Sequence, residues 1–371
     1  MGIGILFLPQ EIGPKTIGIY SFLIMAAICV PLSYLNHKTL SSLIISGGNG
    51  EGSVLTIKSM VGEKASLSYS FLLFISSFSI CIINFIALIA TISNSVDLEY
   101  TEVTRVMSSI IISIIVYMLS SQGHDQIVSI TKYISVPLSI VLIFLSLMLI
   151  PEWKWQGLPD NSDVNFKDIL AFIPIIVFAM NFSPCVSKYV ETSMVDCANN
   201  KVICNRNIST TLIVSCTAIA ITVMFFSFSV SMALNESVLD DVGKNTNSIS
   251  LVARLMGGGV FHIIGLLIVA TASFGALMGT IIGVTDGLKH FSFCKKVADK
   301  KIMLLVCSAL AFIGILNPNI IDLIKLISGP SVIVVGMLFP AIVMLKKRNY
   351  KLIYFIAIFI SLVTLLSSYA L

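Results

Sequence analysis

The sequence predicts an all-α, polytopic membrane protein, and three observations carry this prediction. Hydrophobic residues make up 56% of the 371 residues and charged residues only 11%, against about 25% charged in an ordinary soluble domain. The charges fall between apolar runs of roughly 20 residues, the length of helix that crosses the hydrocarbon core of a bilayer. Lysine and arginine also gather in alternate loops, as in membrane proteins with a fixed orientation.

Ten complete spans are expected, each an apolar run bounded by polar residues, proline or glycine. Ahead of them stands the apolar segment "MGIGILFLPQ", which ends soon after Pro9 and is too short to cross a bilayer. It lacks the basic start of a signal peptide, so we interpret it as the second half of a helix. The expected spans are residues 16 to 36, 67 to 93, 106 to 120, 128 to 150, 169 to 188, 208 to 234, 259 to 284, 302 to 316, 320 to 345 and 352 to 370.

The loops predict an orientation. If the loop after the first full span is cytoplasmic, most of the 23 lysine and arginine residues lie inside, as the positive-inside rule requires. Trp153 and Trp155 then lie just beyond the outer end of a span, where interfacial aromatic residues are common. The net charge of +4 therefore reflects membrane topology and indicates no nucleic-acid partner.

Two polar interruptions divide the spans into corresponding halves. One is the Gly2-Ile3-Gly4 stretch, and the other is Asn181-Phe182-Ser183-Pro184 within the span 169 to 188. Four complete spans separate them, so each half begins with a broken helix and has an odd number of helices. Such halves have opposite orientations, and paired breaks in inverted repeats indicate the central binding site of a transporter.

The residue types at both breaks suit a small zwitterion. Glycine at positions 2 and 4 lets backbone N–H groups approach a carboxylate closely, and a half-helix starting at Ile5 adds partial positive charge. Pro184 ends the helix, at a cost of about 3 kcal/mol in an uninterrupted one, while Asn181 and Ser183 supply donors and acceptors. The alternative is a kinked helix whose polar groups are satisfied by neighbouring helices.

No motif for a metal, a cofactor or an enzyme is present. The eight cysteines contain no C-x-x-C pair, and neither H-E-x-x-H nor G-x-S-x-G occurs. His37, His124 and His290 are expected at cytoplasmic ends of spans, and none of the histidines has a metal-ligand partner at helical spacing. We therefore expect neither metal nor cofactor, and no enzymatic activity.

The sequence resembles the bacterial serine and threonine permeases of the hydroxy and aromatic amino acid permease family, within the amino acid-polyamine-organocation superfamily. The resemblance covers nearly the whole chain, through "GIGILFLP", "IPIIVFAMNFSP", "LIPEWK", "VMFFSFS", "LNPNIIDLI" and "GPSVIVVGMLFPAI". It implies a LeuT-type 5+5 inverted repeat with discontinuous first and sixth helices, in a bacterial inner membrane. The first repeat would cover residues 1-150, N-terminally incomplete, the second 169-345, and an extra C-terminal helix 352-370.

By this resemblance, Gly2, Ile3 and Gly4 hold the carboxylate of the substrate, while Asn181, Phe182 and Ser183 line its amino-group and side-chain end. Members of the family have the cytoplasmic half of the first helix ahead of the Gly-x-Gly, and this sequence does not contain it. We interpret the difference as a mis-called start, with a fragment or a decayed gene as the alternatives.

Proton coupling is implied by the same resemblance, with sodium as the less favoured ion. The permeases have a lysine in their eighth helix, near the stretch "ATASFGALMG" at residues 270 to 279, which contains no basic residue here. Lys132 is the remaining candidate, because a buried amine can release a proton during transport; snorkelling to the inner interface is the alternative explanation. Thr271 and Ser273 could complete an ion site, although small hydroxyl residues also pack membrane helices.

The sequence thus predicts a secondary transporter that works by alternating access and takes up a small amino acid, with serine or threonine as the leading substrate. An aromatic or other neutral amino acid permease is the alternative within transport. A non-transporting sensor or a degenerate permease is the alternative from another class. The expected partners are the amino acid, the proton and the lipid bilayer.

Overall fold

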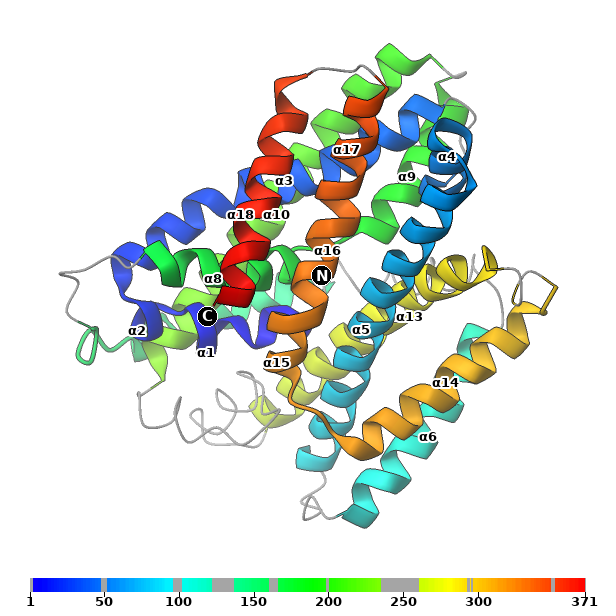
Figure 1. Cartoon of the computed structure of the whole chain (residues 1–371). Helices are drawn as coiled ribbons and strands as arrows, with labels where there is room; N and C mark the ends of the chain where they lie inside the picture. The colour runs from blue at the N-terminus through cyan, green and yellow to red at the C-terminus, as the bar shows by residue number, and fades with distance from the viewer. Residues whose placement is uncertain are drawn as a thin grey trace.

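The computed structural model describes residues 3–47, 52–95, 102–121, 137–159, 166–197, 200–234, 260–291, 294, 296–347 and 351–370. Those ranges form helices and short connections, without a β-strand (Figure 1). Within them, six helices are long and apolar enough to cross a membrane, or seven if the bent pair of helices near residue 181 counts as one span. The expected all-α polytopic class is confirmed.

The helices agree closely with most of the expected spans. In chain order they are η1 (Ile3–Leu6), α1 (Leu8–Ile12), α2 (Pro14–Ile17), α3 (Ile19–Gly47), α4 (Ser53–Val61), α5 (Glu63–Ser95), α6 (Glu102–Ser120), the apolar helix Pro137–Met148, η2 (Ile150–Glu152), α8 (Phe166–Ala179), α9 (Ser183–Asp196), α10 (Lys201–Ala233), α13 (Val260–Lys289), α14 (Asp299–Leu316), α15 (Ile320–Leu323), η3 (Ile324–Ser328), α16 (Gly329–Ile333), η4 (Val334–Leu338), α17 (Phe339–Lys346) and α18 (Leu352–Ala370).

Two elements differ from the sequence-based expectation. The first span was expected to end at residue 36, but α3 continues to Gly47, because the polar residues Asn36 and His37 are buried against other helices. The short helix α4 was not expected at all. Its apolar face, including Val54 and Ile57, is buried in the core of the molecule.

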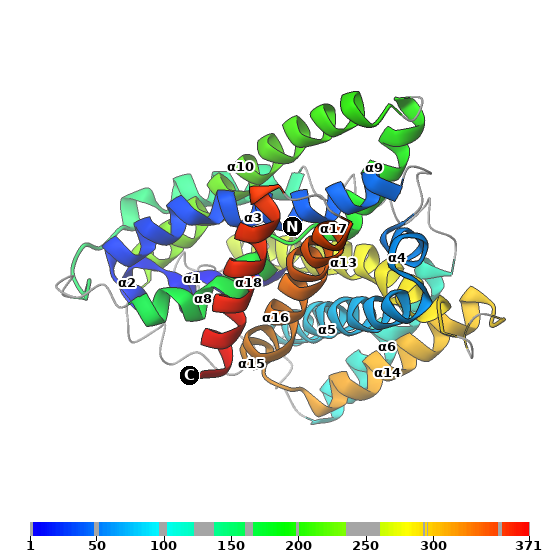
Figure 2. The same cartoon turned by 45° about the horizontal axis from the view of Figure 1, so that its top comes forward.

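Among the described residues, the most extensive contact between two helices joins α5 and α13, which lie side by side in Figure 1. A Cβ built on Gly287 would lie 3.0 Å from the backbone N and Cα of Phe74, and one on Gly283 would lie 2.5 Å from Ser77 Oγ. Small residues at such positions let membrane helices approach closely. The pair α6 and α14 lies against α5, and α3 and α10 form a further pair, with α10 running beside α3 in Figure 2.

The helix that begins at Ile320 contains two π-helical segments, η3 and η4. Between them, Gly329 lies against α8, where an added Cβ would be 2.7 Å from both Cβ and the carbonyl oxygen of Pro174. π-Helical turns disturb the regular backbone ladder and are frequent at functional sites. The close approach places this irregular helix directly beside the broken one.

The α5–α13 contact leads to a stability prediction. We expect Gly287→Leu to destabilise the protein by about 1–3 kcal/mol, because the larger side chain forces the two helices apart. A thermal unfolding scan of the purified protein in detergent measures the change. Gly279→Leu on the same helix is the matched control, since no atom lies within 4 Å of a Cβ at that position. Equal unfolding temperatures for the two variants would contradict the prediction.

Candidate functional site

The second break lies between α8 and α9, which meet at an angle of 51°. The helix α8 ends at Ala179, and Asn181 N–H turns back to donate to the carbonyl of Phe178 at 3.1 Å. The side-chain oxygen of Asn181 accepts from the N–H of Ser183 at 3.2 Å and from its hydroxyl at 2.6 Å. Pro184 follows in the first turn of α9, where a missing N–H does no harm. The predicted discontinuous helix is confirmed.

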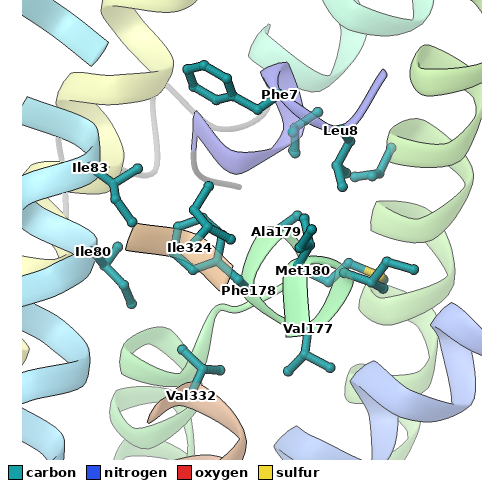
Figure 3. Close-up of a cluster of buried hydrophobic side chains, with 14 of the residues drawn as sticks. Phe7, Leu8, Ile80, Ile83, Val177, Phe178, Ala179, Met180, Ile324 and Val332 are labelled. Carbon is teal, nitrogen blue, oxygen red and sulfur yellow. The ribbon is translucent and has the colours of Figure 1, made fainter. Parts of the chain in front are cut away.

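The N-terminal glycine segment packs directly on this break. Gly4 is buried in the 3₁₀ turn η1, and a Cβ built on it would lie 2.6 Å from Phe178 Cε1 and 3.3 Å from Ala179 Cα. Figure 3 shows Phe7 and Leu8, which follow η1, on one side of Phe178, Ala179 and Met180. The two interruptions therefore contact each other, as the paired-break interpretation requires.

Apolar side chains enclose this contact. Ile80 and Ile83 come from α5, Ile324 from η3 and Val332 from α16, and all four are buried near the end of α8 (Figure 3). The helix α13 also contacts η1. Water has little access to these buried side chains, so a polar contact formed among them is stronger than it would be in solution.

A histidine that the sequence analysis did not select completes the second break. His37 of α3 is 1% exposed, and its Nε2 accepts a hydrogen bond from Phe182 N–H at 3.1 Å. Its ring stacks on the Phe182 ring with centroids 3.8 Å apart and planes 14° apart. The signal in the sequence was the polar triplet Asn36-His37-Lys38, which we took for the cytoplasmic end of a span although α3 continues beyond it.

On the side that the loop charges predict to be outside, one ion pair joins the first broken segment to the π-helical one. Lys325 Nζ of η3 lies 2.7 Å from Glu11 Oε2 of α1. The same amine lies 6.0 Å from the centroid of the Phe172 ring on α8. The Lys325 side chain is 41% exposed, so the pair contributes little to stability, and it shows where α1, α8 and η3 meet at this end.

The remaining predicted site residues are placed as follows. Gly2 and Lys132 lie outside the described residues, and Ile3 is part of η1. Thr271 is exposed on α13 and its hydroxyl donates to the Leu267 carbonyl at 2.6 Å. Ser273 is buried and donates to the Val269 carbonyl at 2.7 Å. The structure thus places Gly4 against Phe178 and Ala179, at the end of α8 that leads into Asn181, Phe182 and Ser183, whereas Thr271 and Ser273 occupy different faces of α13.

In the described ranges, no three His, Cys, Asp or Glu side chains are grouped in a way that could hold a metal ion. The eight cysteines are free thiols. The polar groups gathered at the breaks are backbone N–H groups, one carboxamide, one hydroxyl and one imidazole. Such groups bind and orient a small polar molecule by hydrogen bonds and are well suited to releasing it again.

Comparison with known proteins finds similarity to transporters. No protein-family model matches the chain. It is 25% identical to the inner membrane transport protein YqeG of Escherichia coli over 92% of this chain and 87% of that protein. It is 24% identical to the threonine/serine transporter TdcC of Yersinia enterocolitica, over 92% and 84%, and 24% identical to the serine transporter SdaC of Escherichia coli, over 92% and 83%.

Solved structures agree on the fold. The structure of MhsT in complex with L-phenylalanine superimposes with a TM-score of 0.56, covering 99% of this chain and 98% of that one at 13% identity. A manganese transporter of Eremococcus coleocola gives a TM-score of 0.59, covering 100% and 86% at 13% identity. Both solved structures share their LeuT-type fold with this chain, and the sequence relatives are named as transporters. The chain is a multi-pass membrane transporter, and its sequence relatives include an inner membrane transport protein and transporters named for serine and threonine.

The close contact between Gly4 and the end of α8 predicts that a methyl group added at Gly4 impairs transport. We expect Gly4→Ala to reduce amino acid uptake by about tenfold or more, because its Cβ would displace Phe178 and Ala179, and displacements of about 1 Å at a site have effects of this size. Uptake by cells, normalised to the amount of protein in the membrane, measures this. Gly279→Ala should transport normally, since a Cβ there has no neighbour within 4 Å. Full activity of Gly4→Ala would show that the close contact is dispensable.

Proposed function

We propose that this transporter takes up serine or threonine together with protons. The observation that carries the proposal is the direct contact between Gly4 and the Phe178–Ala179 end of α8, which brings the two interrupted helices to one place. The sequence relatives named as serine and threonine transporters support the choice of substrate. Residues 1-150 and 169-345 would be the inverted repeats that move around this place, with 352-370 as the extra helix.

The substrate would bind between the breaks by its charged ends. Backbone N–H groups of Gly2, Ile3 and Gly4 would hold the carboxylate, because glycine permits close approach and the start of a helix favours an anion. Asn181, Phe182 and Ser183, all partly exposed, would receive the ammonium group and the side chain. The Asn181 oxygen and the Ser183 hydroxyl already form a short hydrogen bond, which a substrate hydroxyl could join or replace.

Proton coupling is the second part of the proposal. From the sequence, Lys132 is the candidate for releasing the proton, and Thr271 and Ser273 are the candidates for an ion site. The hydroxyls of Thr271 and Ser273 each bond to a carbonyl of their own helix, a contact that an ion could exchange for its own coordination.

Transport in a purified system tests the proposed function. We expect proteoliposomes containing this chain to accumulate radiolabelled serine when an inward proton gradient is imposed, and to lose the accumulation when the gradient is dissipated. Competition with unlabelled threonine should reduce the signal strongly, and tryptophan should reduce it weakly. Preferred competition by aromatic amino acids would instead identify an aromatic or neutral amino acid permease. No uptake of any amino acid would favour a sensor or a degenerate protein.

A second experiment tests the candidate coupling residue. We expect Lys132→Ala to retain serine exchange between equal concentrations but to lose accumulation driven by a proton gradient, because the exchange requires binding without net proton movement. Lys64→Ala, which removes an exposed lysine elsewhere, is the control for a loss of positive charge. Unchanged gradient-driven uptake by Lys132→Ala would remove Lys132 from the coupling mechanism.

A further inference from the structure

The hydrogen bonds of His37 fix its protonation state in this conformation. Its Nδ1 lies 2.7 Å from the Ser33 carbonyl oxygen, which can only accept, so Nδ1 carries the proton and donates. Its Nε2 lies 3.1 Å from Phe182 N, which can only donate, so Nε2 carries none and accepts. The imidazole is therefore neutral, with both nitrogens committed, and one of the two bonds belongs to the interrupted helix.

Burial separates this imidazole from other charges. Among the helices packed against α3, Cys216 on α10 receives the Ser33 hydroxyl bond at 3.4 Å, and Lys188 and Glu191 on α9 pair with each other at 3.7 Å. Tyr354 on α18 is buried, and η4 carries no titratable residue. Lys38, the next residue after His37, bonds to Asn205 and Ser209 on α10. None of these groups forms an ion pair or hydrogen bond with His37 in the described part of the chain.

We propose that His37 is a proton-binding residue of the transport cycle and that its partner, Phe182 N–H, links the proton to the substrate site. This inference rests on the proposed proton-coupled uptake, and it adds a second proton-binding residue to the candidate Lys132. A proton from solution would reach Nε2 through the partly exposed break at residues 181 to 184. A new N–H bond would form at Nε2, and no covalent bond would break.

Protonation forces a change at the break. A protonated Nε2 would face Phe182 N–H donor to donor, so this hydrogen bond is lost, while the bond from Nδ1 to the Ser33 carbonyl persists. The stacked Phe182 ring stabilises the resulting cation through its π face. The released Phe182 N–H lies at the start of α9 and can donate to an oxygen of the substrate.

The exchange of partners couples two ligands. A substrate oxygen that accepts from Phe182 N–H removes the donor that His37 needs in its neutral form, so substrate binding favours the protonated imidazole. By thermodynamic reciprocity, proton binding favours the substrate to the same extent. When the substrate leaves on the other side of the membrane, Phe182 N–H returns to Nε2 and the proton is expelled there.

A histidine that only packs α3 against the break would need the hydrogen bonds of its neutral ring but never a second proton at Nε2. The variant His37→Gln separates these roles, because a glutamine side chain can present an oxygen to Phe182 N–H and does not titrate. We expect His37→Gln to bind serine and to exchange it between equal concentrations, but to lose accumulation driven by a proton gradient. His290→Gln, which changes a histidine at the end of α13, should behave as the wild type.

Proton uptake measured on the purified protein gives a readout independent of transport. In weakly buffered detergent solution, at a pH near the midpoint of the His37 titration, serine binding to the wild type should take up about one proton per serine. Binding to His37→Gln should take up none. Gradient-driven accumulation or proton uptake by His37→Gln equal to the wild type would overturn the assignment of His37. If Lys132→Ala lost both gradient-driven accumulation and proton uptake while His37→Gln kept them, Lys132 and not His37 would be the coupling residue.

The outcomes also separate this inference from the proposed function. If wild-type protein neither binds nor accumulates serine, the proposed function fails. If it does both and His37→Gln does so too, only the role of His37 fails. If His37→Gln neither binds nor exchanges serine, ¹⁵N NMR of the wild-type imidazoles decides: serine must shift the titration of the His37 nitrogens, and an unshifted titration overturns the inference.

Discussion

The absence of water from the hydrocarbon region is the constraint on which this structure depends, because each backbone polar group there needs a partner within the protein. A helix meets the requirement by itself, and a broken helix does not. At the break between α8 and α9, the side-chain oxygen of Asn181 accepts a hydrogen bond from Ser183 N–H. His37 Nε2 accepts one from Phe182 N–H. Both partners are side-chain groups that can exchange one bond for another. The break is thereby stable without a ligand and still available to one.

Close packing then determines which elements meet this break. Glycine occupies several points of close approach, among them Gly4 against Phe178, Gly329 against Pro174, and Gly287 against Phe74. Each contact would be lost with a larger residue, because membrane helices associate through close packing and gain no hydrophobic driving force. The pair α5 and α13 forms a long, tight contact, whereas the break joins short segments. Movement is therefore easier at the break than between those two helices.

The sequence predicts the class of the protein and the position of both breaks, because hydropathy and proline act locally. It misses what depends on the orientation of a helix. His37 was expected at a span end, since a polar triplet in an apolar sequence is typical of an interface, yet α3 continues and buries it. Thr271 and Ser273 stay predicted ion-site residues, and the structure adds that one is exposed and the other buried. Only coordinates show that Gly4 lies on Phe178.

The same polar triplet makes α3 a junction between three elements, because consecutive residues of a helix project in different directions. Lys38 bonds to α10 through Asn205, and His37 bonds to the break through Phe182. Asn36 points to the π-helical segment η4, where a Cβ on Gly336 would lie 2.3 Å from its Oδ1. In the described part of the chain, Asn36 has no hydrogen-bond partner for either side-chain atom, although it is fully buried. An unpaired buried amide destabilises the arrangement that contains it, so a shift of η4 that offers Asn36 a backbone partner would be favoured. The helix α3, which carries His37, thus also carries a buried amide, Asn36, that a shift of η4 offering it a hydrogen-bond partner would stabilise.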